Sequence, residues 1–205
     1  MYLEVLNKGR RELFPLLAEF SEFYLVGGTA LALQIGHRVS VDFDLFSHKK
    51  INPNLLGRVE DLFGGKKVEV SVNNKDELTV FVDGIKVTFF HYPFPVIEKL
   101  VSLRGLSVLG VREITISKAY TIGRRGSYRD YVDIYFSLLG GYIKLEEIIT
   151  LAEKKYGDRF NGRLFLEQLV YLDDIEDTKI LFIKKAVTKS EVQNFFEEEV
   201  RKIKL

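Results

Sequence analysis

The chain contains no cysteine, only one methionine and only four prolines in 205 residues. Without cysteine it forms neither disulfides nor thiolate metal sites, so any metal must be held by oxygen or histidine ligands, and zinc is disfavoured. An excess of one charge is also missing, because 30 basic and 29 acidic side chains give a formal net charge of +1. This balance argues against a protein that coats nucleic acid through charge alone, although it permits a local basic patch.

Long hydrophobic runs are absent as well. No stretch has the length of a membrane-spanning helix, and the N-terminus lacks the charged-then-apolar order of a signal peptide. We therefore expect a soluble, cytoplasmic protein with no membrane attachment. A chain of 205 residues can bury a sizeable core, either as one domain or as a domain with a helical annex.

Hydrophobic periodicity predicts an α+β fold, in which a mixed sheet with flanking helices is followed by a C-terminal helical region. The expected strands are 23–26, 40–45, 67–72, 78–82 and 86–92, and the expected helices are 2–20, 29–35, 53–63, 112–122, 127–139, 144–156, 161–171 and 189–203. Asp83-Gly84 is a strong hairpin turn, and Thr188-x-x-Glu191 has the spacing of a capping box. We place a boundary near residue 105, between an α/β region over 1–105 and a helical region over 106–205.

Two aspartates lie close together in the segment Ser40-Val41-Asp42-Phe43-Asp44-Leu45. A strand has a period of two, so Ser40, Asp42 and Asp44 are expected on one face, while Val41, Phe43 and Leu45 enter the core. Two carboxylates held this close repel each other unless a cation lies between them, and a hard divalent cation is the commonest such partner. The pattern indicates a Mg²⁺ or Mn²⁺ site at Asp42 and Asp44.

The segment upstream predicts an anion site. An apolar run, Phe23 to Val26, is followed by Gly27-Gly28, which lets the backbone turn sharply and approach a ligand, and Thr29 opens a helix that ends at Gly36. A helix N-terminus with free N–H groups favours an anion, most often phosphate. Phosphate and metal sites are therefore expected to face each other.

Each of these motifs also has a purely structural interpretation. Asp-x-Asp on a strand is in most proteins a surface pair, and Gly-Gly serves many tight turns, but their joint order and spacing favour a site. Arg38 lies either in a solvated loop or on a triphosphate, whose geometry a guanidinium matches. The histidines are interpreted as structural or exposed, because no pair has ligand spacing. Arg129 and Asp133 stand at i,i+4, which on spacing alone indicates an exposed salt bridge of little energy.

Taken together, the motifs resemble a known pattern. Gly27-Gly28 followed by Asp-x-Asp resembles the nucleotidyltransferase superfamily. Three further motifs are His37-Arg38-x-Ser40-x-Asp42-x-Asp44-Leu45-Phe46, Lys118-Ala119 and Arg129-Asp130-x-x-Asp133. With these motifs, the chain resembles more specifically the AbiEii/AbiGii toxin family over residues 20–140. That family contains the toxin half of toxin–antitoxin or phage-defence pairs.

The resemblance implies a nucleotidyltransferase-like sheet and a set of site residues. The implied nucleotide-binding residues are Gly27, Gly28, Thr29, Arg38, Ser40 and Arg125, and the implied catalytic residues are Asp42, Asp44, Lys118 and Asp130, with Asp133 and Arg129 as further members. Lys118, helped by Arg125, would neutralise phosphate charge. Many members of the superfamily add a third carboxylate on a later strand, but residues 86–92 contain none, which makes Asp130 a candidate to complete the site.

The function implied is transfer of a nucleoside monophosphate from an NTP to an acceptor hydroxyl. The resemblance points to RNA, especially a tRNA 3′ end, or to a protein hydroxyl as acceptor, and to an antitoxin protein as partner. Two alternatives stay open: a degenerate protein that binds nucleotides without turnover, and an interaction module held in check by an antitoxin. Nucleotide binding without release of pyrophosphate would identify the first alternative.

Overall fold

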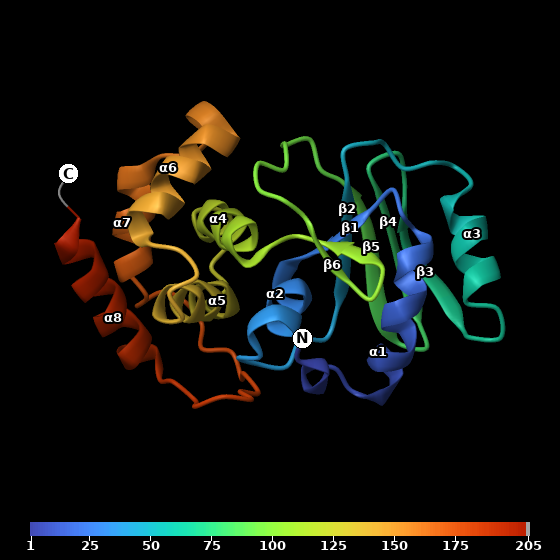
Figure 1. The fold of residues 1–205 in the computed structure, drawn as a ribbon, viewed down its shortest axis with the longest axis horizontal. Coiled ribbons are helices and arrows are strands. Elements are labelled where there is room, and N and C mark those ends of the chain that lie inside the picture. Colours follow the sequence, from blue (N-terminus) through green and yellow to red (C-terminus); the bar gives the residue numbers. More distant parts are fainter. Residues whose placement is uncertain (204–205) are drawn as a thin grey trace. The chain divides into compact units, whose positions relative to one another are not determined.

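The computed structural model describes residues 1–203. Its contacts divide the chain into two compact units. One unit, called the sheet unit below, comprises Met1–Pro95 and Lys99–Gly110, and the other, the helical unit, comprises Val96–Glu98 and the chain from Val111 onward. Figure 1 shows the strands in the first unit and a set of packed helices in the second.

The sheet unit contains a mixed sheet, as predicted. Its strands are β1 (Tyr24–Val26), β2 (Phe43–Ser47), β3 (Val68–Asn73), β4 (Glu77–Val82), β5 (Ile85–His91), β6 (Val101–Leu103) and β7 (Leu106–Val108). They lie in the order β3-β4-β5-β2-β1-β7-β6. The pairs β2–β5 and β1–β7 are parallel, and the other neighbours are antiparallel.

The core of this unit lies on the sheet face formed by alternate residues of β2 and β5. Phe43 and Leu45 of β2 are fully buried, and Leu45 pairs in register with the buried Phe89 of β5. Phe14 stacks on Phe43, and Phe20 packs edge-on against Phe89, so the N-terminal segment covers this face. The period of two then turns Asp44 to the opposite face, as the sequence predicted.

The sheet unit also contains five short helical elements. They are η1 (Leu3–Val5), α1 (Lys8–Leu13), η2 (Phe14–Glu19), α2 (Gly27–Ile35) and α3 (Leu55–Leu62), η denoting a 3-10 helix. The prediction of one continuous helix over 2–20 is therefore wrong. Asn7 caps α1, and Pro15 lies in the first turn of η2, where its missing N–H group breaks the α-helical ladder.

Two further differences concern strands. β2 begins at Phe43 rather than at Ser40, and Val41, expected in the core, lies outside the strand and is 39% exposed. The hairpin β6–β7 was not predicted. Its turn has positive φ at Arg104 and Gly105, and arginine is not a residue that marks such a turn, whereas the predicted Asp83-Gly84 turn has the same positive-φ geometry.

The helical unit agrees with the predicted helices to within two residues at each end. Its helices are α4 (Val111–Ile122), α5 (Tyr128–Leu139), α6 (Leu145–Tyr156), α7 (Gly162–Val170) and α8 (Lys189–Lys202), with a 3-10 turn, η3, at Gly157–Arg159. Helix α4 packs against α5, α6 and α7, and α8 packs against α5 and α7. The predicted capping box is formed, since Thr188 and Glu191 each accept a hydrogen bond from the other's backbone N–H.

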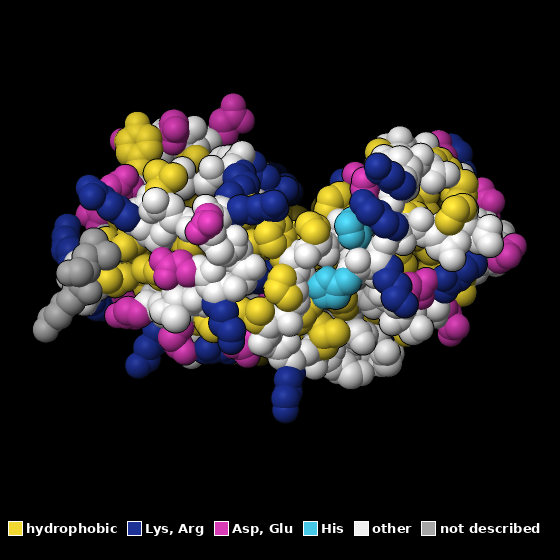
Figure 2. Space-filling view, turned by 90° about the horizontal axis from the view of Figure 1, so that it is seen from above, with side chains coloured by type: hydrophobic (Ala, Val, Ile, Leu, Met, Phe, Trp, Pro, Cys, Tyr) yellow, Lys and Arg dark blue, Asp and Glu magenta, His cyan; other side chains and the backbone are white. Residues whose placement is uncertain are grey.

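Charge of both signs is spread over the surface. On the face drawn in Figure 2, acidic and basic side chains are interspersed over the helical unit, while several Lys and Arg side chains lie beside the histidines of the sheet unit. No helix within residues 1–203 is long and apolar enough to cross a bilayer.

A buried ion pair connects three segments of the helical unit. Glu113 of α4 is fully buried, and its carboxylate binds the ammonium of Lys155 from α6. The same carboxylate accepts hydrogen bonds from the backbone N–H groups of Ile97, at 3.2 Å, and Glu98, at 2.8 Å. Burial lowers the pKa of Lys155, and its bond to Glu113 opposes that shift. The pair therefore holds residues 96–98 against α4 and α6.

Glu113→Ala is expected to destabilise the protein by about 3–5 kcal/mol, because it leaves the Lys155 ammonium buried without its counter-charge. Urea unfolding followed by circular dichroism measures the loss. As a matched control, Glu153→Ala on the exposed side of α6 should change stability by no more than about 0.5 kcal/mol. Unchanged stability of Glu113→Ala would contradict the proposed role of the pair.

Candidate active site

The turn from β1 into α2 lies directly against β2. Val26, the last residue of β1, is paired with Asp44. Helix α2 begins at Gly27, two residues earlier than predicted, and Gly27 has a φ of +72°, which L-residues with a side chain rarely adopt. A Cβ atom on Gly27 would lie 2.9 Å from Oδ2 of Asp44. The glycine therefore keeps open the space beside this carboxylate.

The second glycine makes room for an arginine. A Cβ atom on Gly28 would lie 2.5 Å from Nη2 of Arg38 and 3.3 Å from Oγ of Ser40. Arg38 is only 5% exposed, and its Nη1 also donates to the Val39 carbonyl at 3.1 Å. The interpretation of Arg38 as part of a solvated loop is therefore wrong, and its guanidinium lies against the first turn of α2.

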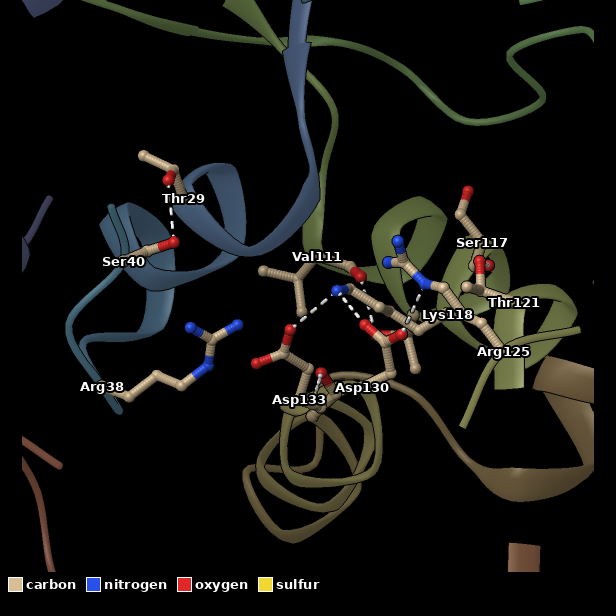
Figure 3. Close-up of polar contacts among 12 residues, drawn as sticks. Thr29, Arg38, Ser40, Val111, Ser117, Lys118, Thr121, Arg125, Asp130 and Asp133 are labelled. Atoms are coloured by element: carbon tan, nitrogen blue, oxygen red, sulfur yellow. Dashed lines mark hydrogen bonds and ion pairs between the residues drawn. The ribbon is translucent and has the colours of Figure 1, made fainter. Parts of the chain in front are cut away.

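Two hydroxyl groups connect α2 to the segment that precedes β2. Oγ1 of Thr29 lies 2.8 Å from Oγ of Ser40 and also within hydrogen-bond distance of the Asp42 carbonyl. Figure 3 shows the Thr29–Ser40 contact. A hydroxyl donates only one hydrogen, so Thr29 donates to one partner and accepts from the Ser40 hydroxyl when it donates to Asp42. These contacts fix the residues leading into β2 on the first turn of α2.

The two carboxylates occupy different elements. Asp44 is on β2, whereas Asp42 precedes the strand. The position of Asp42 therefore follows from the hydrogen bond between the Thr29 hydroxyl and the Asp42 carbonyl, and not from strand pleating. Both residues are partly exposed. The residue paired with Asp44 on β5 is Thr88, at the place where a third carboxylate was sought. Residues 1–203 contain no group of three or more acidic, histidine or cysteine side chains able to hold a metal.

The helical unit contains a second cluster of predicted residues. The ammonium of Lys118, on α4, binds Oδ1 of Asp130 and lies 3.0 Å from Oδ2 of Asp133, both on α5. Figure 3 shows Lys118 between the two carboxylates. Nε of Arg125 lies 3.2 Å from Oδ2 of Asp130. The side chains of Lys118, Asp130 and Asp133 are at most 9% exposed, while that of Arg125 is 66% exposed.

The predicted ion pair between Arg129 and Asp133 is not formed. Asp133 is fully buried, whereas Arg129 is exposed, and among the described residues Asp133 pairs with Lys118 instead. The i,i+4 spacing was a poor guide here because Asp130 and Asp133 both turn toward α4. Both oxygens of Asp130 already face cations, Lys118 and Arg125, which disfavours its use as a metal ligand.

The fold and the site together define the class of the protein. A mixed sheet, with Gly-Gly opening a helix beside the Asp-x-Asp segment that leads into the next strand, is what the resemblance to the nucleotidyltransferases implies. Residues 11–203 match the family model described as "Nucleotidyl transferase AbiEii toxin, Type IV TA system". The chain belongs to this family, and it is a nucleotidyltransferase.

One relative in sequence and two solved structures are similar to this chain. The chain is 32% identical over 185 residues to the uncharacterized protein aq_aa25 of Aquifex aeolicus (strain VF5), a match that covers 88% of this chain and 87% of the relative. Its fold is similar to that of a provisionally assigned nucleotidyltransferase from H. pylori, with a TM-score of 0.62 at 18% identity and coverage of 96% and 95% of the two chains. It is also similar to MenT4, a nucleotidyltransferase toxin from Mycobacterium tuberculosis H37Rv, with a TM-score of 0.61 at 18% identity and coverage of 96% and 82%.

Gly27→Ala is expected to destabilise the protein by about 1–2 kcal/mol, because alanine is strained at this positive φ and its methyl group meets Asp44. Gly57→Ala is the matched control, since Gly57 lies on the exposed side of α3 with nothing within 4 Å of its added Cβ. That change should stabilise the protein by about 0.5 kcal/mol. Equal effects of the two substitutions in urea unfolding would contradict the geometry described for Gly27.

Proposed function

We propose that this protein transfers a nucleoside monophosphate from an NTP to a hydroxyl of an RNA acceptor, in a reaction that depends on Mg²⁺ or Mn²⁺. The observation that carries the proposal is the position of Asp44 beside the first turn of α2, where Gly27 leaves room next to its carboxylate. Backbone N–H groups at that turn favour phosphate, so phosphate and carboxylate sites adjoin within the sheet unit.

The donor set fits the metal that the family implies. Asp42 and Asp44 supply carboxylate oxygens, the chain has no thiolate, and the space that a Cβ on Gly27 would fill borders Oδ2 of Asp44. Asp42 and Asp44 would hold the ion, which when bound offsets the negative charge of the triphosphate. Hard oxygen ligands of this kind favour Mg²⁺ or Mn²⁺ over zinc.

The chain's own residues would position the nucleotide for reaction. Gly27, Gly28 and Arg38 would bind the phosphates, while the bonded hydroxyls of Thr29 and Ser40 hold Asp42 in place. The acceptor hydroxyl oxygen forms a bond to the α-phosphorus as the bond from that phosphorus to the pyrophosphate oxygen breaks, and the hydroxyl proton passes to solvent. In such a displacement, positioning and electrostatic stabilisation supply most of the catalysis.

Lys118 is proposed to offset the negative charge of the NTP phosphates, and Arg125 is proposed to contribute more weakly to the same effect. Asp130 and Asp133 hold the Lys118 ammonium in one place. Asp130 is therefore assigned the positioning of these cations. Arg129, which is exposed, has no assigned step.

The biological setting follows from the family description, Type IV TA system. We propose that the chain is a toxin whose activity is restrained by an antitoxin protein, with a tRNA 3′ end as the acceptor. Its proposed location is the cytoplasm. A second candidate, a nucleotide-binding protein without turnover, is favoured by the lack of a third carboxylate near Asp42 and Asp44 within the described residues.

Asp42→Asn and Asp44→Asn are each expected to abolish nucleotide transfer while the protein stays folded, because an amide lacks the charge that holds the metal. Stability should be unchanged or higher, since repulsion between the carboxylates is relieved. Release of pyrophosphate and label transfer to RNA measure activity, and thermal unfolding measures stability. Asp61→Asn, on the exposed side of α3, is the matched control and should keep full activity. Turnover retained by both site variants would refute the proposal.

Lys118→Met is expected to reduce both stability, by about 3–5 kcal/mol, and transfer, because two buried carboxylates lose their shared cation. Lys154→Met, exposed on α6, is the control for loss of a lysine. The triple variant Lys118→Met/Asp130→Asn/Asp133→Asn removes all three charges and should recover stability. Transfer that stays lost in the folded triple variant supports a role for the cluster in the reaction, and recovered transfer shows that the cluster is only structural.

A further inference from the structure

The loop between α4 and α5 contains an arginine held flat on an aromatic stack. The rings of Tyr120 and Tyr156 are stacked at 3.9 Å with an interplanar angle of 13°. The guanidinium carbon of Arg124 lies 3.6 Å from the centre of the Tyr120 ring. Two flat groups this close to one ring must occupy its opposite faces, so the order is Tyr156, Tyr120, Arg124. We call these three residues the Arg124 stack.

The outer end of the Arg124 stack is fixed and accessible. Nη1 of Arg124 donates to the Tyr120 carbonyl at 2.8 Å, and Nη2 donates to the Arg159 carbonyl at 2.6 Å. These bonds hold the guanidinium plane in one orientation, although Arg124 is an exposed residue. A planar cation with one face covered and its edge already bonded has its other face left for stacking.

The stack borders a pocket of about 430 Å³ within the helical unit. Its lining includes Arg124, Arg125, Glu167, Gln168, Tyr171 and Asp174. This volume is within the range of small-ligand sites. Tyr171 is 56% exposed and offers a second ring, and Gln168 and Glu167 offer an amide and a carboxylate. Gly123 allows the close approach of Gln168, since a Cβ there would lie 2.8 Å from the Gln168 Oε1 atom.

The charges of the pocket select among anionic ligands. The two arginines are offset by Glu167 and Asp174, so a free triphosphate meets carboxylates as well as cations. A nucleotide within a strand has only one phosphate charge, so these carboxylates repel it less than they repel a free triphosphate. A base also presents a flat face and an edge of donors and acceptors, and unpaired bases stack on guanidinium planes and aromatic rings, whereas paired bases are inaccessible.

We propose that this pocket binds an unpaired nucleobase of the RNA acceptor, stacked on Arg124. This inference rests on the proposed function for the identity of the acceptor as RNA. The loop between α4 and α5 would then recognise single-stranded RNA. The nucleotide that reacts at Asp42 and Asp44 is a separate ligand.

The test is equilibrium binding of fluorescent oligoadenylate to the full-length protein, followed by anisotropy, with an abasic strand, an RNA duplex and ATP as competing probes. Arg124→Lys retains the charge but removes the plane, and it should weaken oligoadenylate binding by about 5- to 100-fold, the usual value of one stacked base. Binding of the abasic strand and the duplex should not change. Arg201→Lys, at another exposed arginine, on α8, is the matched control and should bind as the wild type does.

Thermal unfolding checks that Arg124→Lys is folded, and Tyr171→Leu is a second variant that changes the pocket without altering the bonds of Arg124. Unchanged oligoadenylate binding in both variants, or an equal loss for the abasic strand, would overturn the proposal. A loss seen for ATP and not for oligoadenylate would also overturn it. Transfer without Arg124-dependent binding contradicts only this inference, and Arg124-dependent binding without transfer contradicts only the proposed function.

Discussion

The antiparallel pairing of β1 with β2 is the constraint on which the candidate site depends. It places Val26 opposite Asp44, so the chain leaving β1 must turn at once beside that carboxylate. Only a residue without a side chain combines a φ of +72° with an atom of Asp44 so near, and Gly27 is that residue. The hydroxyl contacts of Thr29 then bring the chain back from α2 to the start of β2. One turn thus positions both the carboxylates and the N–H groups that we propose bind phosphate.

The helical unit organises charge in a different way. Its buried charged groups form two separate sets: Glu113 with Lys155 joins α4 to α6, and Lys118 with Asp130 and Asp133 joins α4 to the next helix, α5. Buried pairs add little net stability compared with apolar residues of the same shape, but losing one partner is costly. The first set is explained by the packing of α4 and α6 alone. The second set contains residues that the family resemblance implies are catalytic. An effect of these residues on nucleotide transfer must therefore be distinguished from their effect on the stability of the fold.

Much of this organisation was predictable from local sequence signals. Helices α4 to α8 and the Asp83-Gly84 hairpin follow from periodicity and turn chemistry, and the Gly-Gly and Asp-x-Asp motifs fall where the sheet and α2 meet. Non-local facts were not predictable. The pairing of Thr88 with Asp44 depends on the register of β5 with β2, and the pairing of Asp133 with Lys118 rather than Arg129 depends on how α5 packs on α4. The β6–β7 turn was missed because Arg104 adopts a conformation that its residue type does not indicate.

Transfer of nucleotide to RNA is the central claim, and it can be measured directly. Purified protein is incubated with each α-labelled NTP, Mg²⁺ and total tRNA, and the label in RNA and the released pyrophosphate are followed together. The account predicts that label enters RNA with stoichiometric release of pyrophosphate and that chelation of the metal stops both. Nucleotide binding with neither labelled RNA nor pyrophosphate would contradict it and would identify a nucleotide-binding protein without turnover.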